Sequence, residues 1–453
     1  MLNRRMTVRA VVGGVGVAAL VAVMSTARAS GPSVIQTAEL ADQALGTFYN
    51  RLVTSPIDQI TDDRGIRLGS LSSDLFNDPS ESYNEFWTVT DRGPNGNPSL
   101  RTFVVPQFTP LIMHVRVHGT SISVLQSLPI VDDSNRPVTG LSNISGFDET
   151  PFNYNGTAQL AFNPNGLDVE GIVRMADRSF WLVDEYSPSL VHVTSTGRVA
   201  ERFVPEDSQL AGTLATSPNY RVRKSLPKIL NTRRQNRGFE GLAVSPDQRA
   251  LFIAMQSPLE YPTRALGRAS RMVRIFKFDV GLERVTAEYV YEFDEVCTFL
   301  GQRTGCGVVP GEMKISALYA ISGTSLLVQE RTDTATKVYR VELANATNIL
   351  GTQWDTQAAA PTASTTALES LTNAASQGVT VLPKTLLIDV TALPGMPGKI
   401  EGIALPRNNV LVVGNDNDFG LVDNPTFSAS GQLTNDTQAK SQLIFIDLAT
   451  AVN

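Results

Sequence analysis

The sequence predicts an all-β protein built as a β-propeller, and three observations lead to this prediction. Short strands recur along most of the chain, five similar strands end in an acidic or amide residue, and a Glu-Gly element opens several units about 70 to 90 residues apart. Repeated units bury their faces on one another, so 453 residues can form one domain. A two-layer sandwich, the competing all-β fold, does not predict such a recurring element.

Each repeated unit contains several strands in a fixed order. Runs of β-branched and aromatic residues that end in an acidic or amide residue cover residues 86–91, 180–185, 251–256, 326–330 and 410–416. Shorter strands precede four of them at 168–172, 238–242, 313–316 and 399–403. Third strands follow at 190–193, 274–278, 337–341 and 443–446, with candidates for a fourth at 287–293 and 385–390.

Five blades are visible in this pattern. We expect an N-terminal strand around residues 46–53 to complete the last blade and close the ring. A sixth, disguised blade would fit best within residues 118–165. Residues 37–49 are equally compatible with a helix, and residues 353–378, rich in Ala, Thr and Ser, are expected to form a mobile loop with little to bury.

The first 29 residues have the features of a signal peptide. Arg4 and Arg5 precede an apolar run at residues 10–24, and a small-x-small motif follows at 27–29. That run would rise only about 22 Å as a helix, too short to span a bilayer comfortably. We therefore expect one propeller domain at residues 30–453 that is periplasmic or secreted, with no integral membrane segment after cleavage; the arginine pair leaves the twin-arginine route open.

Charge and cysteine content narrow the choice of partners. Removing residues 1–29 takes away four arginines and no acids, which changes the net charge from −6 to near −10. An acidic chain argues against nucleic acid or an anionic membrane as a partner. We expect a monomer that acts on a small substrate, whose anionic or ester character is indicated by the basic residues and by the family resemblance described below. Cys297 and Cys306 close a ten-residue loop, which in an oxidising compartment predicts a disulfide.

The repeated carboxylates predict a metal site. The first strand of each propeller blade lines the central channel, so acids at corresponding positions in several blades converge on one place. Like charges brought together raise one another's pKa or bind a cation, and oxygen ligands without His or Cys favour Ca²⁺. The candidate ligands are Asp91, Glu170, Asp184, Glu185, Glu240, Glu330, Glu401, Asp416 and Asp418. The alternative is that each Glu caps a turn.

Basic residues stand among these acids. Arg92 follows Asp91, Lys314 takes a Glu position in its unit, and Arg331 follows Glu330. Arg92, Lys314 and Arg331 are candidate catalytic residues that bind the anionic group of a substrate beside the metal, and salt bridges between blades explain them equally well. A nucleophilic triad is poorly supported because the three histidines lie in strand patterns and no Gly-x-Ser-x-Gly element occurs.

Several of these motifs resemble a known family. Asp91-Arg92-Gly93, the Glu-Gly openings, the residues 329–331 and the Gly-Asn-Asp-Asn-Asp-Phe element at 414–419 are similar to the family named "esterase-like activity of phytase", over residues 65–447. The resemblance implies a secreted propeller and a hydrolase of phosphate or carboxyl esters. Gln256 departs from the pattern, since other blades place an acid or Asn there.

Together these patterns predict an exported, phytase-like propeller. Its expected chemistry is metal-dependent hydrolysis of a phosphate or carboxyl ester by a metal-activated water, with Ca²⁺ as the cofactor. The alternative is a binding propeller without catalysis, in which a structural Ca²⁺ holds the blades together.

Overall fold

The computed structural model describes residues 31–46, 63–97, 99–214, 220–302 and 305–452. The signal peptide expected at residues 1–29 lies outside these residues. In the described part of the chain, no helix is long and apolar enough to cross a membrane.

Strands dominate the structure, and the helices are short. The strands are β1 (Ser33–Leu40), β2 (Asp74–Phe76), β3 (Glu85–Val89), β4 (Asn95–Gly96), β5 (Thr102–Phe103), β6 (Leu111–His118), β7 (Ser121–Pro129), β8 (Val169–Arg174), β9 (Phe180–Asp184), β10 (Ser189–Val193), β11 (Val199–Pro205), β12 (Arg221–Leu226), β13 (Phe239–Val244), β14 (Ala250–Met255), β15 (Met272–Asp279), β16 (Arg284–Glu292), β17 (Lys314–Ala320), β18 (Ser325–Arg331), β19 (Thr336–Glu342), β20 (Lys384–Asp389), β21 (Ile400–Arg407), β22 (Val410–Asn415) and β23 (Gln442–Asp447). The helices are α2 (Gln209–Leu214), α3 (Arg264–Ala269), α4 (Val296–Phe299) and the 3₁₀ turns η1 (Lys228–Thr232), η2 (Pro310–Glu312), η3 (Gln353–Asp355), η4 (Leu368–Ser370), η5 (Ala375–Gln377), η6 (Val390–Ala392) and η7 (Asp418–Gly420).

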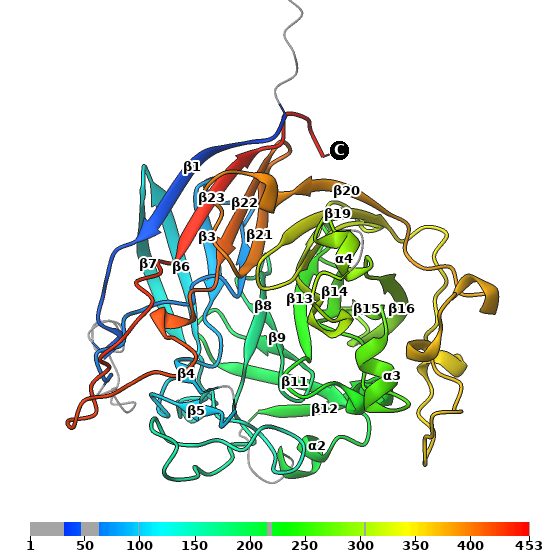
Figure 1. The fold of residues 1–453 in the computed structure, drawn as a ribbon, viewed down its shortest axis with the longest axis horizontal. Coiled ribbons are helices and arrows are strands. Elements are labelled where there is room, and N and C mark those ends of the chain that lie inside the picture. The colour runs from blue at the N-terminus through cyan, green and yellow to red at the C-terminus, as the bar shows by residue number, and fades with distance from the viewer. Residues whose placement is uncertain (1–30, 47–62, 98, 215–219, 303–304, 453) are drawn as a thin grey trace, which may run out of the picture.

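These strands form blades arranged around a ring, so the predicted propeller is confirmed (Figure 1). The sheets run β8-β9-β10-β11-β12, β13-β14-β15-β16 and β17-β18-β19-β20, and an eight-stranded sheet runs β2-β3-β6-β7-β1-β23-β22-β21. Consecutive strands of the third and fourth blades pair antiparallel, and so do β8 to β11 of the second blade, whereas its outermost strand β12 pairs in parallel with β11. The innermost strands of the described blades contact one another in a closed cycle, β2 to β8, β13, β17, β21 and back to β2.

An N-terminal strand completes the last blade, as expected, but at a different place. β1 pairs antiparallel with β23, and the two lie side by side in Figure 1. β1 also pairs in parallel with β7 at Glu39 and Leu40, which joins the last blade to the first. The strand therefore lies at residues 33–40, so the expected position around 46–53 is wrong, and much of that segment falls outside the described residues.

The second strand of each blade is covered on both faces by neighbouring blades. Every residue of β9 and of β14 is buried, which explains why these strands read as continuous apolar runs rather than alternating ones. The outer strand β6 alternates buried and exposed residues at its far end, because one face meets solvent there.

Two other expectations about long segments need correction. Residues 118–165 contain the outer strand β7 and, beyond it, only isolated bridges, so they do not form a further blade. Residues 353–378 do bury apolar side chains: Trp354 and Leu368 pack with Met272 and Val290 of the third blade. The sparse apolar residues of this segment were sufficient to anchor it.

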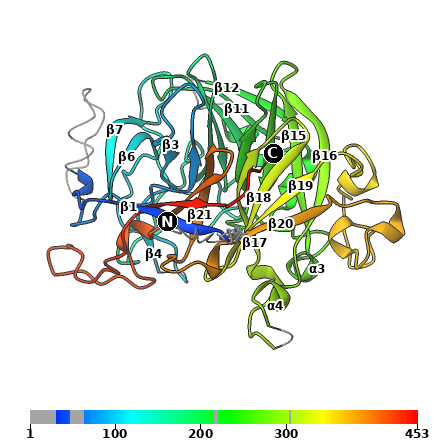
Figure 2. The ribbon, with the colours of Figure 1, turned by 90° about the horizontal axis from the view of Figure 1, so that it is seen from above.

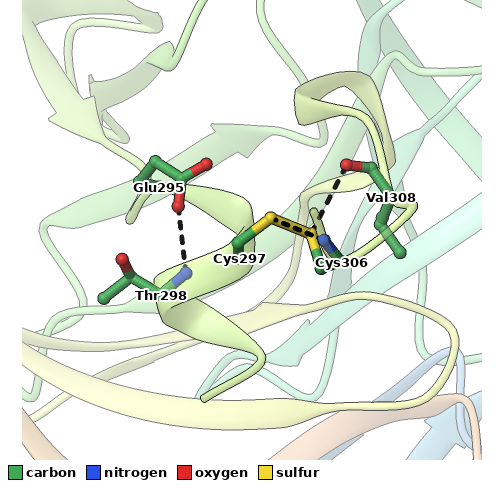
Figure 3. The surroundings of a disulfide bond; sticks show 5 residues. All are labelled: Glu295, Cys297, Thr298, Cys306 and Val308. Atoms are coloured by element: carbon green, nitrogen blue, oxygen red, sulfur yellow. Dashed lines mark hydrogen bonds between the residues drawn. A yellow bond between two sulfur atoms is a disulfide. The ribbon is translucent and has the colours of Figure 1, made fainter. Parts of the chain in front are cut away.

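Cys297 and Cys306 form the predicted disulfide, with their Cα atoms 5.3 Å apart (Figure 3). Cys297 lies in α4, whose first turn is capped by Glu295, which accepts a hydrogen bond from the Thr298 amide at 3.0 Å. Helix α4 projects beyond the sheets near α3 (Figure 2). The disulfide thus holds a short surface excursion between the third and fourth blades.

Candidate functional site

Charged residues from successive blades meet around one cavity of about 220 Å³ at one end of the inner strands. Among the described residues, eight carboxyl groups and six basic side chains line it. The lining residues are Asp91, Arg92, Asn95, Gly96, Arg101, Glu170, Glu185, Asn236, Arg237, Glu240, Gln256, Lys314, Arg331, Lys399, Glu401, Asp416, Asp418, Leu421, Val422 and Asp423.

A β-bulge places the repeated glutamates. The pairing between the inner strand and its neighbour skips one residue in each of four blades, and the skipped residues are Glu170, Glu240, Ser316 and Glu401. A bulge turns a side chain out of the normal alternation, and bulges are common beside functional sites. Ser316 therefore holds the Glu position of its blade. The sequence-based placement of Lys314 there is wrong: Lys314 corresponds to the residue two positions earlier.

The glycine after each glutamate has a packing role. A Cβ on Gly171 would lie 2.6 Å from the Val183 side chain and 2.8 Å from the Cβ of Leu242 on the next inner strand. A Cβ on Gly241 would lie 2.8 Å from Leu318 in the same way. The Glu-Gly pair therefore combines a bulged carboxylate with the close approach that adjacent inner strands require.

Three carboxylates gather where the first and second blades meet. Oxygens of Asp91, Asp168 and Glu170 lie within 4.8 Å of one another. Burial, followed by the negative charges of Asp416 and Asp168, raises the pKa of Asp91 well above its usual range. Burial also raises the pKa of Glu170 well above its usual range, with Glu240 as the next cause. We call these three residues the acidic trio.

The acidic trio has few protein partners. Asp91 accepts a hydrogen bond from the Gly93 amide at 2.8 Å, and Asp168 pairs with the Arg92 guanidinium at 3.1 Å. No hydrogen bond or ion pair from another described residue reaches the buried Glu170 carboxylate. An unpaired buried carboxylate is costly unless it is protonated or binds a cation, so the trio is suited to a cation with oxygen ligands.

Gln256, the departure from the acidic pattern, connects two of the predicted ligands. Its side-chain nitrogen donates to Glu185 at 2.7 Å and also to Glu240. Burial and the neighbouring Glu401 raise the pKa of Glu240 to about 8, so Glu240 holds a proton at neutral pH. An acid in place of Gln256 would add a further like charge beside both carboxylates, whereas the amide supplies donors.

Basic residues lie across the ring from the acidic trio. Arg331 pairs with Glu401 and donates to the Ser316 hydroxyl at 2.5 Å, while Lys314 pairs with Asp333 at 2.8 Å. Burial, then the charge of Arg331, lowers the pKa of Lys314 to about 8. Lys314 therefore exchanges a proton near neutral pH while remaining able to bind an anion.

Lys399 is a further basic residue of the cavity wall, and it lies beside two acids. Lys399 lies 3.8 Å from Asp416 and also pairs with Asp418. Burial raises the pKa of Asp416, but the charge of Lys399 together with hydrogen bonds from the Asp418 amide and the Ser70 hydroxyl lowers it by more, so the net pKa is lowered. Asp416 is therefore ionised at neutral pH, whereas the pKa values of Asp91 and Glu170 are raised.

Two predicted ligands lie outside the cavity. Asp184 is fully buried, pairs with Arg202 at 2.7 Å and accepts a hydrogen bond from Ser189 at 2.9 Å. Glu330 is also fully buried and pairs with Lys384 and with the Tyr291 hydroxyl. Their side chains point into the blades because strand residues alternate in direction, and both act in the packing of a blade.

Arg92 lies beside the acidic trio rather than beside Lys314 and Arg331, the other two candidate catalytic residues. Its guanidinium is held by Asp168 and by Asn236, and Glu149 lies 3.7 Å away. Four charged residues of the cavity wall were missed in the sequence, namely Arg101, Arg237, Lys399 and Asp423, and so was Asp168 of the acidic trio. Asp168 and Lys399 each precede a bulged glutamate by two residues, so superposing the units would have revealed them.

Comparison with known proteins places the chain in a family. The family described as "Esterase-like activity of phytase" matches residues 66–419. This range includes every residue that lines the central cavity except Leu421, Val422 and Asp423. The chain belongs to this phytase-like family. The resemblance expected from the Glu-Gly and Asn-Asp-Asn-Asp-Phe elements is thereby confirmed.

Individual relatives are more distant. An uncharacterized secreted protein of Arthroderma benhamiae is 29% identical over 237 residues, which are 46% of this chain and 46% of that protein. The match thus spans less than half of the relative's length.

Solved structures give low similarity scores. The Cps50 (Swd1) β-propeller domain of Myceliophteria thermophila covers 84% of this chain and 97% of its own, at 11% identity and a TM-score of 0.31. The PQQ-bound aldose sugar dehydrogenase of Streptomyces coelicolor covers 86% and 87%, at 9% identity and a TM-score of 0.28. The assignment of the fold rests on the strand pairing described above.

Proposed function

We propose that the protein is a metal-dependent hydrolase of anionic esters, with phosphate esters as the preferred class. The observation that carries this proposal is the division of the central cavity into two sides. Glu170 of the acidic trio lacks a partner among the described residues, and Lys314 and Arg331 of the fourth blade lie across the ring from the trio. A cation and an anionic substrate group would each find opposite charge there.

The acidic trio fits Ca²⁺ better than other common ions. Asp91, Asp168 and Glu170 offer only oxygen atoms, and they come from different blades, so their spacing can adjust to a large ion with irregular coordination. In these three residues, Glu170 is the ligand with no competing protein partner. A bound divalent cation would polarise the ester and lower the pKa of a bound water.

The protein's own residues have separate tasks in this proposal. Lys314 and Arg331 bind and orient the anionic group of the substrate, and Ser316 and Glu401 hold the Arg331 guanidinium in position. Glu240 retains its proton at neutral pH and donates it to the leaving oxygen. Gln256 fixes the Glu240 carboxyl by donating to it from the neighbouring strand.

Export is part of the proposal. The first 29 residues have the composition of a signal peptide, the chain contains a disulfide, and the fungal relative is described as a secreted protein. These observations support a periplasmic or secreted location. We also propose that the protein acts as a monomer.

A binding propeller without catalysis is the second candidate, and the origin of the acidic trio favours it. Asp91 follows β3 in the first blade, whereas Asp168 and Glu170 belong to the second, so an ion between them would join the two blades. In that case the cation would stabilise the fold, and the cavity would bind an anion without turnover.

The deciding experiment combines metal analysis with a hydrolysis screen. The purified protein would be tested on p-nitrophenyl phosphate and p-nitrophenyl acetate with Ca²⁺ or with EDTA, alongside Glu170→Gln and the surface control Glu342→Gln. We expect phosphatase activity that requires Ca²⁺, is lost in Glu170→Gln and is retained in Glu342→Gln. Calcium binding without hydrolysis of either ester would favour the binding propeller.

A further inference from the structure

A second polar cluster lies at the opposite end of strand β3 from the central cavity. Glu85 begins β3, His114 stands across from Trp87 on the neighbouring strand β6, and Glu81 lies in the turn between β2 and β3. The structure assigns to Glu81, Glu85 and His114 a second metal site, which takes Zn²⁺ and is separate from the central cavity.

The distances among the three side chains suit a zinc ion. The Nε2 atom of His114 lies 3.2 Å from Oε2 of Glu81 and 3.2 Å from Oε2 of Glu85. Zinc bonds to nitrogen and oxygen of about 2.0 to 2.2 Å in tetrahedral geometry separate neighbouring ligand atoms by about 3.3 to 3.5 Å. Ligand atoms of all three side chains lie within 4.8 Å of one another, so one ion could contact all three after the carboxylates shift toward it.

The Nε2 atom of His114 makes no hydrogen bond with the described residues. Nε2 is buried, and none of the described residues accepts a hydrogen bond from it, although two carboxylate oxygens are near. The two oxygens thus lie beside the axis along which a ring N–H would point. Ligands that share an ion are arranged in this way, because the ion itself occupies the axis of the nitrogen lone pair.

The imidazole is held in a fixed position. The ring stacks on Trp87 with its centroid 4.4 Å away and the planes 5° apart. This packing fixes the ring orientation before any ion binds.

Neighbouring donors hold the two carboxylates. The Trp87 indole donates to Glu81 Oε2 at 3.0 Å, and Arg174 donates to Glu81 Oε1 at 2.8 Å. Arg116 donates to Oε1 of Glu85 at 3.0 Å, which leaves Oε2 of Glu85 facing only the imidazole. Outer donors of this kind orient metal ligands in proteins.

The chemistry of this site differs from that of the acidic trio. One imidazole with two carboxylates selects zinc or a similar transition ion, whereas the all-oxygen trio prefers Ca²⁺. Six residues of extended chain separate Glu85 from Asp91, which corresponds to about 20 Å. The two sites therefore bind their ions independently.

The second blade supplies a matched control. His192 stands across from Trp181 on paired strands and stacks on it with a centroid distance of 4.5 Å, as His114 does on Trp87. In the described residues no pair of carboxylates gathers around His192 within the spacing that the first cluster shows. Replacing His192 removes the same stacking contact without removing a proposed ligand.

The test is zinc titration of the full-length protein by calorimetry in excess Ca²⁺, which saturates the all-oxygen site. We expect the wild type and His192→Gln to bind zinc with equal affinity. The affinity of His114→Gln should be lower by about tenfold or more. Glu85→Gln provides a second variant if His114→Gln does not fold, as judged by circular dichroism. Visible absorption of bound Co²⁺ should show the same loss.

Three results would contradict the proposed zinc site. Absence of zinc uptake by the wild type would do so, as would equal zinc affinity in the wild type and in whichever folded ligand variant is titrated. An equal loss in His114→Gln and His192→Gln would show that the stacking contact, and not a ligand, was responsible.

Discussion

Arg331 and Glu401 form a buried ion pair between two neighbouring blades. Arg331 ends β18 of the fourth blade, and Glu401 is the bulged residue of β21 in the fifth. The same guanidinium reaches Ser316 on its own blade and lies 3.9 Å from Glu240 on the third. One arginine thus connects the bulge positions of three successive blades beside the central cavity.

This arrangement predicts a large loss of stability when Arg331 is removed. Arg331→Met should lower the free energy of unfolding by about 3 to 5 kcal/mol, because Glu401 is left as a buried charge without its partner. Urea denaturation in EDTA would measure it. The double variant with Glu401→Met should recover much of the loss, and Arg340→Met, which breaks a surface pair, should cost about 1 kcal/mol or less. A loss of about 1 kcal/mol or less for Arg331→Met, as expected for a surface pair, would show that Arg331 and Glu401 do not depend on each other in this way.

The acidic trio predicts opposite effects of one substitution on stability and on metal binding. Glu170→Gln should raise the melting temperature in EDTA, because it replaces a buried carboxyl group whose ionisation is opposed by burial and by neighbouring carboxylates. It should also weaken Ca²⁺ binding, so that saturating Ca²⁺ stabilises the variant less than the wild type. Thermal melts with EDTA and with Ca²⁺ would measure both effects. A melting temperature that falls in EDTA would show that Glu170 makes a favourable contact.

Most of the architecture could be predicted from the sequence, because strands that are buried on both faces are continuous apolar runs that are easy to recognise. The runs at 251–256 and 410–416 are β14 and β22, and the Glu-Gly elements open inner strands as expected. The first blade was different: its inner strand β2 has only three residues and carries no Glu-Gly element. The closing strand β1 was missed because its apolar and polar residues also fit a helix.

The candidate site was predicted only in outline. Convergence of Glu170, Glu240 and Glu401 followed from their equivalent positions, and all three line the cavity. Asp184 and Glu330 were misplaced because residues at the end of a strand can point into the blade or toward the axis, and a one-residue difference decides which. The pairing of each with a distant arginine or lysine cannot be read from spacing alone.

The buried carboxyl groups predict a pH dependence of stability in metal-free protein. The pKa of Glu240 is about 8 in the folded state, against about 4.3 for an unperturbed glutamate. Between pH 5 and about 7.5 the folded state therefore binds more protons than the unfolded state. Stability should fall as pH rises, by up to about 1.4 kcal/mol per pH unit for each such group. Urea denaturation in EDTA across this range would measure the slope.

Calcium should flatten this pH dependence, because an ion takes the place of protons in the acidic trio. The same denaturation series with excess Ca²⁺ is the comparison, and Glu342→Gln at the surface is the control variant. Stability that does not change with pH in EDTA between pH 5 and 7.5 would show that the central carboxyl groups ionise normally. Identical slopes with and without Ca²⁺ would argue against cation binding.

The close approach of the inner strands predicts that the Glu-Gly glycines tolerate no side chain. Gly241→Ala should destabilise the protein by about 1 to 3 kcal/mol, because the added Cβ would lie 2.8 Å from Leu318 on the next blade. Gly323→Ala is the matched control, since no atom lies within 4 Å of a Cβ there. Equal denaturation midpoints for the two variants would mean that the ring can widen at no cost.

Loss of the disulfide should have a modest effect confined to the excursion around α4. Replacing Cys297 and Cys306 by serine frees a loop of ten residues, which should lower the free energy of unfolding by about 2 to 3 kcal/mol. The central cavity should keep its cation affinity, because the fourth-blade cavity residues Lys314 and Arg331 are held by contacts with Asp333 and Glu401 rather than by the disulfide. Denaturation and Ca²⁺ calorimetry on the double variant would measure the two effects separately. A joint loss of stability and cation binding would show that the excursion supports the cavity, since the third and fourth blades that it connects both contribute residues to the cavity wall.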